Sequence, residues 1–465
     1  MAKIKDDVSE MSRRTFLATV SAAASAPLLG AADAQDLAVK GGRPVRSTPL
    51  TTQYEGANFI GEEEKRELDE AVETRSLFRF YGFTQPHKAR TFEEEFQRLM
   101  GVKYALGVTS GTAALHVAIN ALGVGPGDEV ILPAETWHSD YNAILMTGAL
   151  PVFCEINESF AMDPDDLRMK ITPDTKAIIP SHLSGTVADM DAIMAIAREH
   201  NLKVLEDSAE AIGASYKGRR TGSIGDIGIF SFQTAKMMTS GEGGCVITND
   251  PALYERAIRF HDLGGVRPVF RTVLGITDYP RGGQGTAGDR GGETTLGLNY
   301  RMNEETGAVL CAQLRKVDTA IANHRRMHQY VAERLKDLPG IKLRPSNDPE
   351  GDIAISLDLL LPTQEVRNQF IQAMKAENVP MDVGIQGTRN LPTMGYIEDK
   401  VSPHPQWPSF NTVRGKAMKY GAECTPRSIG LKNRYASMYI GPKWTDDDLN
   451  DVVTAITKVH AALRS

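Results

Sequence analysis

One lysine stands in a position from which it can react covalently with a carbonyl group. Lys236 follows the apolar segment 227–232, which predicts a buried strand, and it precedes the glycine-rich segment 241–244. A turn between these segments can hold the amine beside a cofactor aldehyde, where partial desolvation and neighbouring cations lower its pKa and make it nucleophilic. The chain has many lysines, so other groups are needed to define a site.

A candidate phosphate site lies earlier in the chain, in the sequence Thr109-Ser-Gly-Thr112. It precedes a predicted helix at 112–122, and the free amides and positive dipole end of a helix N-terminus attract anions. The glycine also allows a ligand to approach the backbone closely. The alternative is that Ser110 is an ordinary N-cap without a ligand.

Two further side chains have the chemistry to hold an aromatic ring. Asp207 follows the predicted strand 202–205, and a buried carboxylate there can keep a pyridine nitrogen protonated, which makes the ring an electron sink. Trp137 can stack on such a ring. Each has a structural alternative, because an aspartate can cap a helix and a tryptophan can belong to the core. His138 and His182 are interpreted as structural.

The rest of the pattern predicts the elements that position these groups. Short apolar strands are expected at 105–108, 130–132, 152–154, 177–181, 202–205, 227–232 and 245–248, separated by amphipathic helices such as 190–200. This alternation is typical of an α/β protein with a mostly parallel sheet covered by helices on both faces. Ligands gather at the carboxyl ends of such strands, so Ser110, Asp207 and Lys236 are expected around one crevice.

The chain is expected to divide into three parts. Residues 1–34 are an N-terminal signal, residues 35–320 a large cofactor-binding domain, and residues 321–465 a smaller C-terminal α/β domain.

Several elements outside the main sheet are also predicted. The large domain begins with an extended arm at 37–46, and helices are expected at 303–325, 327–335 and 446–463. Thr445 is a suitable N-cap for the last of these helices. The stretch 264–292 is dense in glycine and arginine, and such a loop is either functional or disordered.

The first 34 residues resemble a twin-arginine export signal. Arg13 and Arg14 precede a short apolar run at 18–32, which is followed by a small-x-small cleavage pattern ending at Ala34. The run is too short, and too interrupted by polar residues and proline, to anchor the chain in a membrane as a helix. We expect a periplasmic or exported protein whose mature chain starts near Gln35. A disordered basic tail is the alternative.

Composition excludes some other functions. The formal net charge of −7 argues against a nucleic-acid binder, which normally has a basic face. The four cysteines have no CxxC spacing, so we expect mostly buried free thiols and no structural metal site.

Together, these segments resemble the DegT/StrS-type family of pyridoxal-phosphate-dependent sugar aminotransferases, of the aspartate-aminotransferase fold type I superfamily. The resemblance covers nearly all of the chain after the signal. It rests on the order and spacing of these motifs: Ser110-Gly-Thr-Ala-Ala-Leu115, 133–137, Glu206-Asp-Ser-Ala209, Gly225-Asp226, Phe230-Ser-Phe232, Lys236, Gly241-Glu-Gly-Gly244 and Leu296-Gly-Leu-Asn-Tyr-Arg-Met302.

The resemblance implies a fold type I structure and two catalytic residues. Lys236 would bind the aldehyde of pyridoxal phosphate covalently and then move protons between substrate and cofactor. Asp207 would bind the pyridine nitrogen, and Trp137 would stack on the ring.

The resemblance also implies the remaining cofactor contacts. The amides of Gly111 and Thr112 and the hydroxyl of Ser231 would hold the phosphate. Asn299 would reach the phosphate of the neighbouring subunit, which implies a homodimer with shared active sites. Glu210 stands where relatives often carry histidine or glutamine, so its role in cofactor binding is less defined.

The implied reaction is a ping-pong transamination from L-glutamate or L-glutamine to a keto-sugar or keto-cyclitol. Relatives with histidine at the lysine position dehydrate sugars, and Lys236 disfavours that branch. The segments 41–46 and 231–236 look closest to members that act on keto-cyclitols such as scyllo-inosose. Two alternatives remain: elimination or epimerisation of an amino substrate with the same cofactor, and a cofactor-binding sensor without turnover.

Overall fold

The computed structural model describes residues 36–52, 59–80, 87–276, 296–385 and 388–464. Its main element is a seven-stranded sheet with the strand order β1 (Tyr104–Val108), β10 (Gly244–Thr248), β9 (Ile227–Ser231), β6 (Lys203–Asp207), β5 (Thr175–Ile178), β2 (Glu129–Pro133) and β4 (Leu150–Cys154). In this sheet β10 runs antiparallel to both neighbours, and the other six strands share one direction. The prediction of an α/β fold with a mostly parallel sheet is therefore confirmed.

Helices cover both faces of this sheet, which is why its strands are apolar on both faces. Successive residues of β9 point to opposite sides, so that Ile229 belongs to one core and Phe230 to the other. The core around Phe230 is closed by α3 (Lys88–Met100), α6 (Pro164–Lys170), α7 (Met190–Glu199) and part of α10 (Glu304–Leu335). The core around Ile229 is closed by α4 (Gly111–Ala121), α5 (Ser139–Met146), α8 (Pro251–His261) and α9 (Pro268–Leu274).

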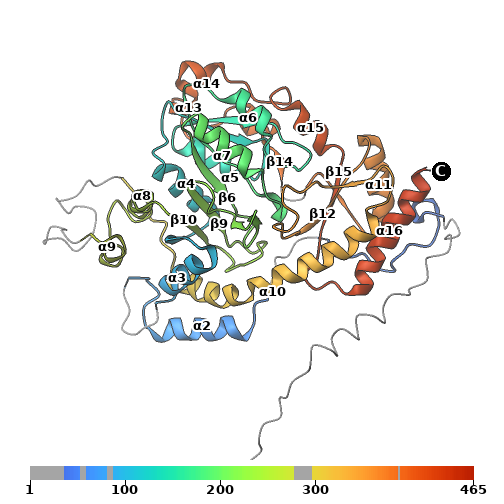
Figure 1. Ribbon diagram of the computed structural model, residues 1–465, viewed down its shortest axis with the longest axis horizontal. Coiled ribbons are helices and arrows are strands. Elements are labelled where there is room, and N and C mark those ends of the chain that lie inside the picture. Colours follow the sequence, from blue (N-terminus) through green and yellow to red (C-terminus); the bar gives the residue numbers. More distant parts are fainter. Residues whose placement is uncertain (1–35, 53–58, 81–86, 277–295, 386–387, 465) are drawn as a thin grey trace, which may run out of the picture.

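The helix α10 is continuous over 32 residues, and the prediction of two helices at 303–325 and 327–335 is wrong. Only Arg326 separates the two predicted helices. Neither it nor its neighbours are glycine or proline, so nothing at this point stops a helix. Figure 1 shows α10 running from α3 to α16 (Asp446–Arg464), along both parts of the molecule. Its Leu310 lies in the core of the large sheet, and its Val331 lies in the core of a second sheet.

The second sheet has the order β11 (Lys342–Leu343), β12 (Ser356–Leu360), β15 (Tyr435–Tyr439) and β13 (Asp382–Val383). Its core includes α11 (Gln364–Ala376) and α16. The arm predicted as extended contains a 3₁₀ turn, η1 (Ala38–Lys40), and packs here because Glu377 accepts hydrogen bonds from the amides of Ala38 and Val45.

The chain returns to the large sheet before it ends. A two-stranded ladder joins β3 (Glu135–Thr136) to β14 (Arg389–Asn390), and Leu391, Ile397 and Tyr420 lie in the core around Ile229. The remaining short elements are α2 (Glu62–Glu73), β7 (Ser215–Tyr216), β8 (Arg219–Arg220), η2 (Leu183–Gly185), η3 (Leu391–Thr393), α12 (Gly395–Glu398), α13 (Pro408–Asn411), α14 (Val413–Ala417) and α15 (Pro426–Lys432). The domain boundary at residues 320–321 stays a prediction.

Other expectations can be compared with the described residues. All four cysteines are free, and Cys154, Cys245 and Cys311 are buried, as expected. Within the described ranges, no helix is long and apolar enough to cross a membrane, and no group of three metal-ligating side chains occurs. The predicted signal and residues 277–292 of the glycine-rich stretch lie outside the described residues.

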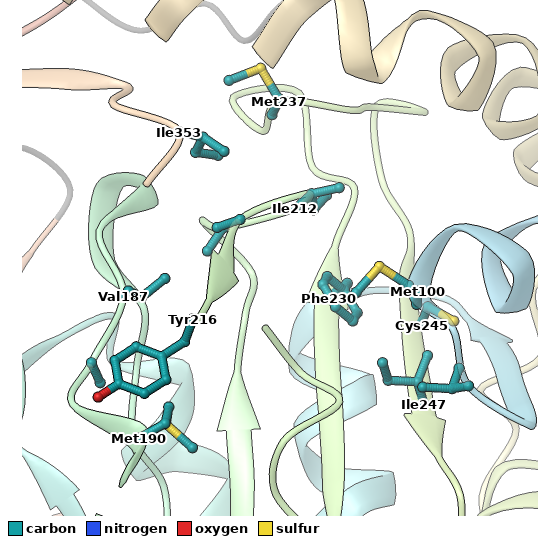
Figure 2. Close-up of a cluster of buried hydrophobic side chains, with 14 of the residues drawn as sticks. Met100, Val187, Met190, Ile212, Tyr216, Phe230, Met237, Cys245, Ile247 and Ile353 are labelled. Carbon is teal, nitrogen blue, oxygen red and sulfur yellow. The ribbon is translucent and has the colours of Figure 1, made fainter. Parts of the chain in front are cut away.

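A cluster of buried side chains supports β9, the strand that leads to Lys236 (Figure 2). Phe230 is fully buried, and its ring lies edge-on to Phe96 of α3 with the centroids 5.0 Å apart. Met100 and Cys245 belong to the same cluster. The packing of these side chains fixes β9 against the helix layer.

Truncation of Phe230 to alanine should therefore destabilise the protein strongly. We expect Phe230→Ala to lower the free energy of unfolding by about 3–5 kcal/mol, because it removes a fully buried ring and leaves a cavity. Urea unfolding followed by circular dichroism measures this as a lower midpoint. The control Met169→Ala changes a side chain that is 73% exposed and should shift stability by less than about 0.5 kcal/mol. Equal midpoints for the two variants would contradict the assignment of Phe230 to the core.

Candidate active site

The carboxyl ends of the large-sheet strands open into a cavity of about 420 Å³. Ile355 precedes β12 and Tyr439 ends β15, at the same end of this antiparallel pair, and both also line the cavity, so it lies between the two sheets. It contains all but one of the residues predicted from the sequence, namely Gly111, Thr112, Trp137, Asp207, Glu210, Ser231 and Lys236. The expectation that Ser110, Asp207 and Lys236 share one crevice is met.

The first turn of α4 forms a cradle suited to an anion. Ser110 caps the helix, and its Oγ accepts a hydrogen bond of 3.1 Å from the amide of Ala113. The amides of Gly111 and Thr112 lie in the first turn, where a helix offers no carbonyl partners. A Cβ at Gly111 would lie only 2.7 Å from the Cβ of Ser231, so glycine is needed for this close approach of helix and strand. Serine capping and anion binding are therefore compatible here.

Asp207 is the last residue of β6, whereas the predicted strand ended two residues earlier, at residue 205. Its backbone amide donates to Pro180, its carbonyl accepts from His182, and its Oδ1 accepts from the amide of Ala209 at 2.9 Å. Burial raises the pKa of the Asp207 carboxyl above its ordinary value, because removal from water disfavours the charged form. A cation bound in the cavity would stabilise the carboxylate.

Lys236 lies in a turn held by its own neighbours. Its amide donates to the carbonyl of Gln233 at 2.8 Å, and the adjacent Met237 is buried in the core cluster (Figure 2). The Nζ atom of Lys236 donates to Glu210 Oε1 at 3.1 Å, and Glu210 Oε2 accepts from the amide of Ser184 at 3.0 Å. Among the described residues, the amine of Lys236 thus contacts an anion, whereas the sequence predicted neighbouring cations.

Trp137 lines the cavity with its side chain partly exposed. The residue is 44% exposed, and its ring lies against that of His138 with the centroids 4.4 Å apart. Trp137 is therefore not part of the buried core, and its position in the cavity lining is compatible with stacking on a ligand. His182 also lines the cavity; its Nε2 lies 3.1 Å from Glu206 Oε2 and its Nδ1 accepts from the amide of Ala188. Its interpretation as structural stays a prediction.

Asn299 is the predicted residue that does not line the cavity. It is exposed, and its backbone bridges to Asp262, after α8. Its service to a neighbouring subunit stays a prediction.

Sequence reasoning missed several polar groups of the cavity, namely Thr136, Ser139, Ser181, Ser184, Gln233 and Glu242. Ser181 had a usable signal, because it closes the predicted strand 177–181, and strand ends carry ligand-binding residues. Ser184 had none: it adopts a left-handed backbone with φ of 50° in the turn η2.

The groups present fit pyridoxal phosphate. The cradle at Gly111 suits its phosphate, the buried carboxylate of Asp207 suits a protonated ring nitrogen, and the amine of Lys236 suits its aldehyde. Gly111, Asp207 and Lys236 all line one cavity, and its volume lies within the usual range of ligand-binding pockets.

The fold and this cavity define a class of protein, the pyridoxal-phosphate-dependent aminotransferases of fold type I. The structure superposes on that of 3-amino-5-hydroxybenzoic acid synthase with a TM-score of 0.72 and 27% sequence identity, covering 90% of this chain and 100% of the other. The chain belongs to the DegT/DnrJ/EryC1/StrS aminotransferase family, whose pattern matches residues 59–457.

Two relatives show how far the similarity extends. The chain is 40% identical to GDP-perosamine synthase of Caulobacter vibrioides over 255 residues, which are 55% of this chain and 63% of the relative. It is 32% identical to the spore coat polysaccharide biosynthesis protein SpsC of Bacillus subtilis over 410 residues, which are 86% of this chain and 95% of the relative. The match thus spans less than two thirds of the first relative and nearly all of the second.

The close approach at Gly111 generates a prediction on cofactor binding. Gly111→Ala should weaken binding of pyridoxal phosphate about tenfold or more, because the added methyl group pushes the first turn of α4 away from Ser231. Equilibrium dialysis measures the affinity, and circular dichroism confirms folding. Gly395→Ala is the matched control, since a Cβ there meets nothing within 4 Å. An unchanged affinity in Gly111→Ala would show that the N-terminus of α4 does not bind the phosphate.

Proposed function

We propose that this chain transfers an amino group from L-glutamate or L-glutamine to the ketone of a sugar or cyclitol, in ping-pong order. The observation that carries the proposal is the convergence of Lys236, Asp207 and the α4 N-terminus on one cavity. Membership of the aminotransferase family supports amino transfer. Relatives named as a perosamine synthase and a polysaccharide biosynthesis protein support a sugar-like acceptor.

Each cavity residue has a separate task in this proposal. Bound pyridoxal phosphate supplies an electron-withdrawing ring and an aldehyde that carries the amino group from donor to acceptor. Asp207 holds the proton on the ring nitrogen, and Trp137 packs on the ring face. Glu210 holds the amine of Lys236 at its place in the cavity, and Lys236 acts as nucleophile and then as general acid and base.

The polar lining supports an acceptor that carries hydroxyl groups. Ser184, Gln233 and Glu242 all line the cavity. Ser184 Oγ is buried and has no hydrogen-bond partner among the described residues, so a substrate hydroxyl can pair with it. These contacts suit a keto-sugar and a keto-cyclitol equally.

A homodimer belongs to the same proposal. Asn299 is exposed outside the cavity of its own chain, as expected of a residue that serves a neighbouring active site. The two active sites would then be shared between subunits.

The first test is the visible absorbance of the purified protein loaded with pyridoxal phosphate, before and after addition of L-glutamate or L-glutamine. We expect a yellow protein that bleaches with a donor, followed by transfer of ¹⁵N from the labelled donor to an added keto-sugar or keto-cyclitol. Loss of labelled ammonia without an aminated product would indicate elimination. A protein that cannot be loaded would favour a role without turnover.

The covalent role of the lysine gives a second readout. Lys236→Ala should retain the wild-type circular dichroism spectrum and melting temperature within a few degrees, but lose amino transfer by at least about a thousandfold, because it removes the nucleophile and the proton carrier. Lys419→Ala, which changes an exposed lysine, is the control and should keep full activity. Undiminished activity in Lys236→Ala would overturn the proposal.

We also propose that the protein is exported by the twin-arginine machinery. The paired arginines, apolar run and cleavage pattern of residues 1–34 support this. An exported enzyme calls for an acceptor that is not linked to a nucleotide, such as an oxidised glycoside or free cyclitol.

Export can be tested by changing only the two arginines. The wild-type chain, produced in a bacterium with a twin-arginine pathway, should be found in the periplasm with an N-terminus near Gln35. The double variant Arg13→Lys/Arg14→Lys should stay in the cytoplasm at full length, because the pathway recognises the arginine pair. The control Lys3→Arg/Lys5→Arg should be exported normally. An intact Met1 in the cytoplasm for all three chains would contradict export.

A further inference from the structure

A second carboxyl group is buried beside Asp207. Asp140 lies in the first turn of α5 and is fully buried. The backbones of Ser181 and Asp207 form a parallel bridge, and the Ser181 hydroxyl in turn contacts Asp140. The side chains of Asp140 and Asp207 lie close enough to interact with each other. Neither the transamination chemistry nor the family motifs described above assign a task to Asp140.

The hydrogen bonds of Asp140 differ between its two oxygens. Oδ2 lies 2.7 Å from the hydroxyl of Thr136 and 3.2 Å from that of Ser181, and both can donate to it. Oδ1 is buried and receives a hydrogen bond from no donor in the described part of the chain. This is the pattern of a neutral carboxylic acid, in which the carbonyl oxygen accepts and the other oxygen carries the proton. The adjacent acceptor for that proton is the Asp207 carboxylate.

Electrostatics favour the same protonation state. Burial, followed by the negative charge of Asp207, raises the pKa of Asp140 well above its ordinary value. The N-terminus of α5 acts in the opposite direction, but a helix end is a smaller effect than a second like charge in a buried site. For Asp207, burial raises the pKa and the charge of Glu210 adds to that. The backbone hydrogen bond from Ala209, the charge of Lys236 and the hydrogen bond from Asp140 lower it.

We propose that Asp140 is a positioning residue that stays neutral and donates a hydrogen bond from Oδ1 to Asp207. Thr136 and Ser181 orient the Asp140 carboxyl through its other oxygen. Asp207 is thereby held as a carboxylate in a fixed orientation toward the cavity. The consequence for the cofactor ring rests on the proposed function, whereas the protonation of Asp140 does not.

The protonation state can be measured without any cofactor. Infrared difference spectra at neutral pH, wild type minus Asp140→Asn, should show the C=O stretch of a protonated carboxylic acid. The control difference, wild type minus Asp165→Asn, changes an exposed carboxylate and should show none. Absence of the protonated band in the first difference would overturn the proposal, whatever the protein catalyses.

Binding measurements test the positioning role. Asparagine has the shape of the neutral acid and can donate to Asp207, so Asp140→Asn should bind pyridoxal phosphate with about the wild-type affinity. Asp140→Ala should weaken binding about tenfold or more, as expected when a residue that supports a charged ligand contact is lost. Inorganic phosphate, used as a competitor at α4, should bind all three proteins equally, and a general structural defect would weaken both ligands.

The remaining outcomes are also decisive. Equal losses in Asp140→Asn and Asp140→Ala would show that an ionised Asp140 is needed, and wild-type affinity in both would show that it has no positioning role; either result overturns the proposal. A wild-type protein that binds no pyridoxal phosphate would overturn the proposed function, while the infrared spectra would still decide the state of Asp140. Melting temperatures identify a variant that does not fold.

Discussion

The parallel pairing of β6 with β9 is the constraint on which the active site depends. In this register Asp207 lies opposite Ile229, so the end of β6 stands beside the last residues of β9. Ser231 and the turn with Lys236 follow from there. A shift of one residue would turn every side chain of a strand to the opposite face and would place Asp207 away from the cavity. Side-chain packing opposes such a shift, because Ile229 and Phe230 have different shapes and each is packed in a different core.

Two neighbouring acidic residues on β6, Glu206 and Asp207, differ in the hydrogen bonds that their carboxyl groups receive. Glu206 is fully buried, and its carboxylate accepts hydrogen bonds from the amides of Gly222, Ile224 and Gly225. Buried charges with such a full set of donors are structural. Asp207 points to the opposite side and has one backbone donor for its carboxylate, together with the neighbouring Asp140. Its need for a cation is what suits it to a protonated ring.

The cavity depends on both sheets, and α10 links their cores. Leu310 and Val331 of this one helix pack into different hydrophobic clusters, so the two sheets share a continuous support. Tyr439, from the smaller sheet, reaches the cavity opened by the larger one. The ladder between β3 and β14 adds a second connection next to Trp137. The substrate side of the site is therefore built by tertiary packing between parts of the chain that are distant in sequence.

The sequence alone predicted the residues that could do the chemistry: a helix N-terminus for a phosphate, a tryptophan and a carboxylate for a ring, and a lysine in a turn. These features are local, because a helix N-terminus or a strand end is encoded by adjacent residues. The sequence could not show the neighbours of those groups. The contact of Lys236 with Glu210, the buried Asp140 behind Asp207 and the turn at Ser184 all join residues from separate elements. The continuity of α10 was also missed, because the charged residues around Arg326 suggested a boundary between two helices. The structure shows one helix whose two ends pack into different cores. The type of each reactive group and its place at a strand end or helix N-terminus follow from neighbouring residues. The burial and protonation of each such side chain depend on which distant segments pack against it.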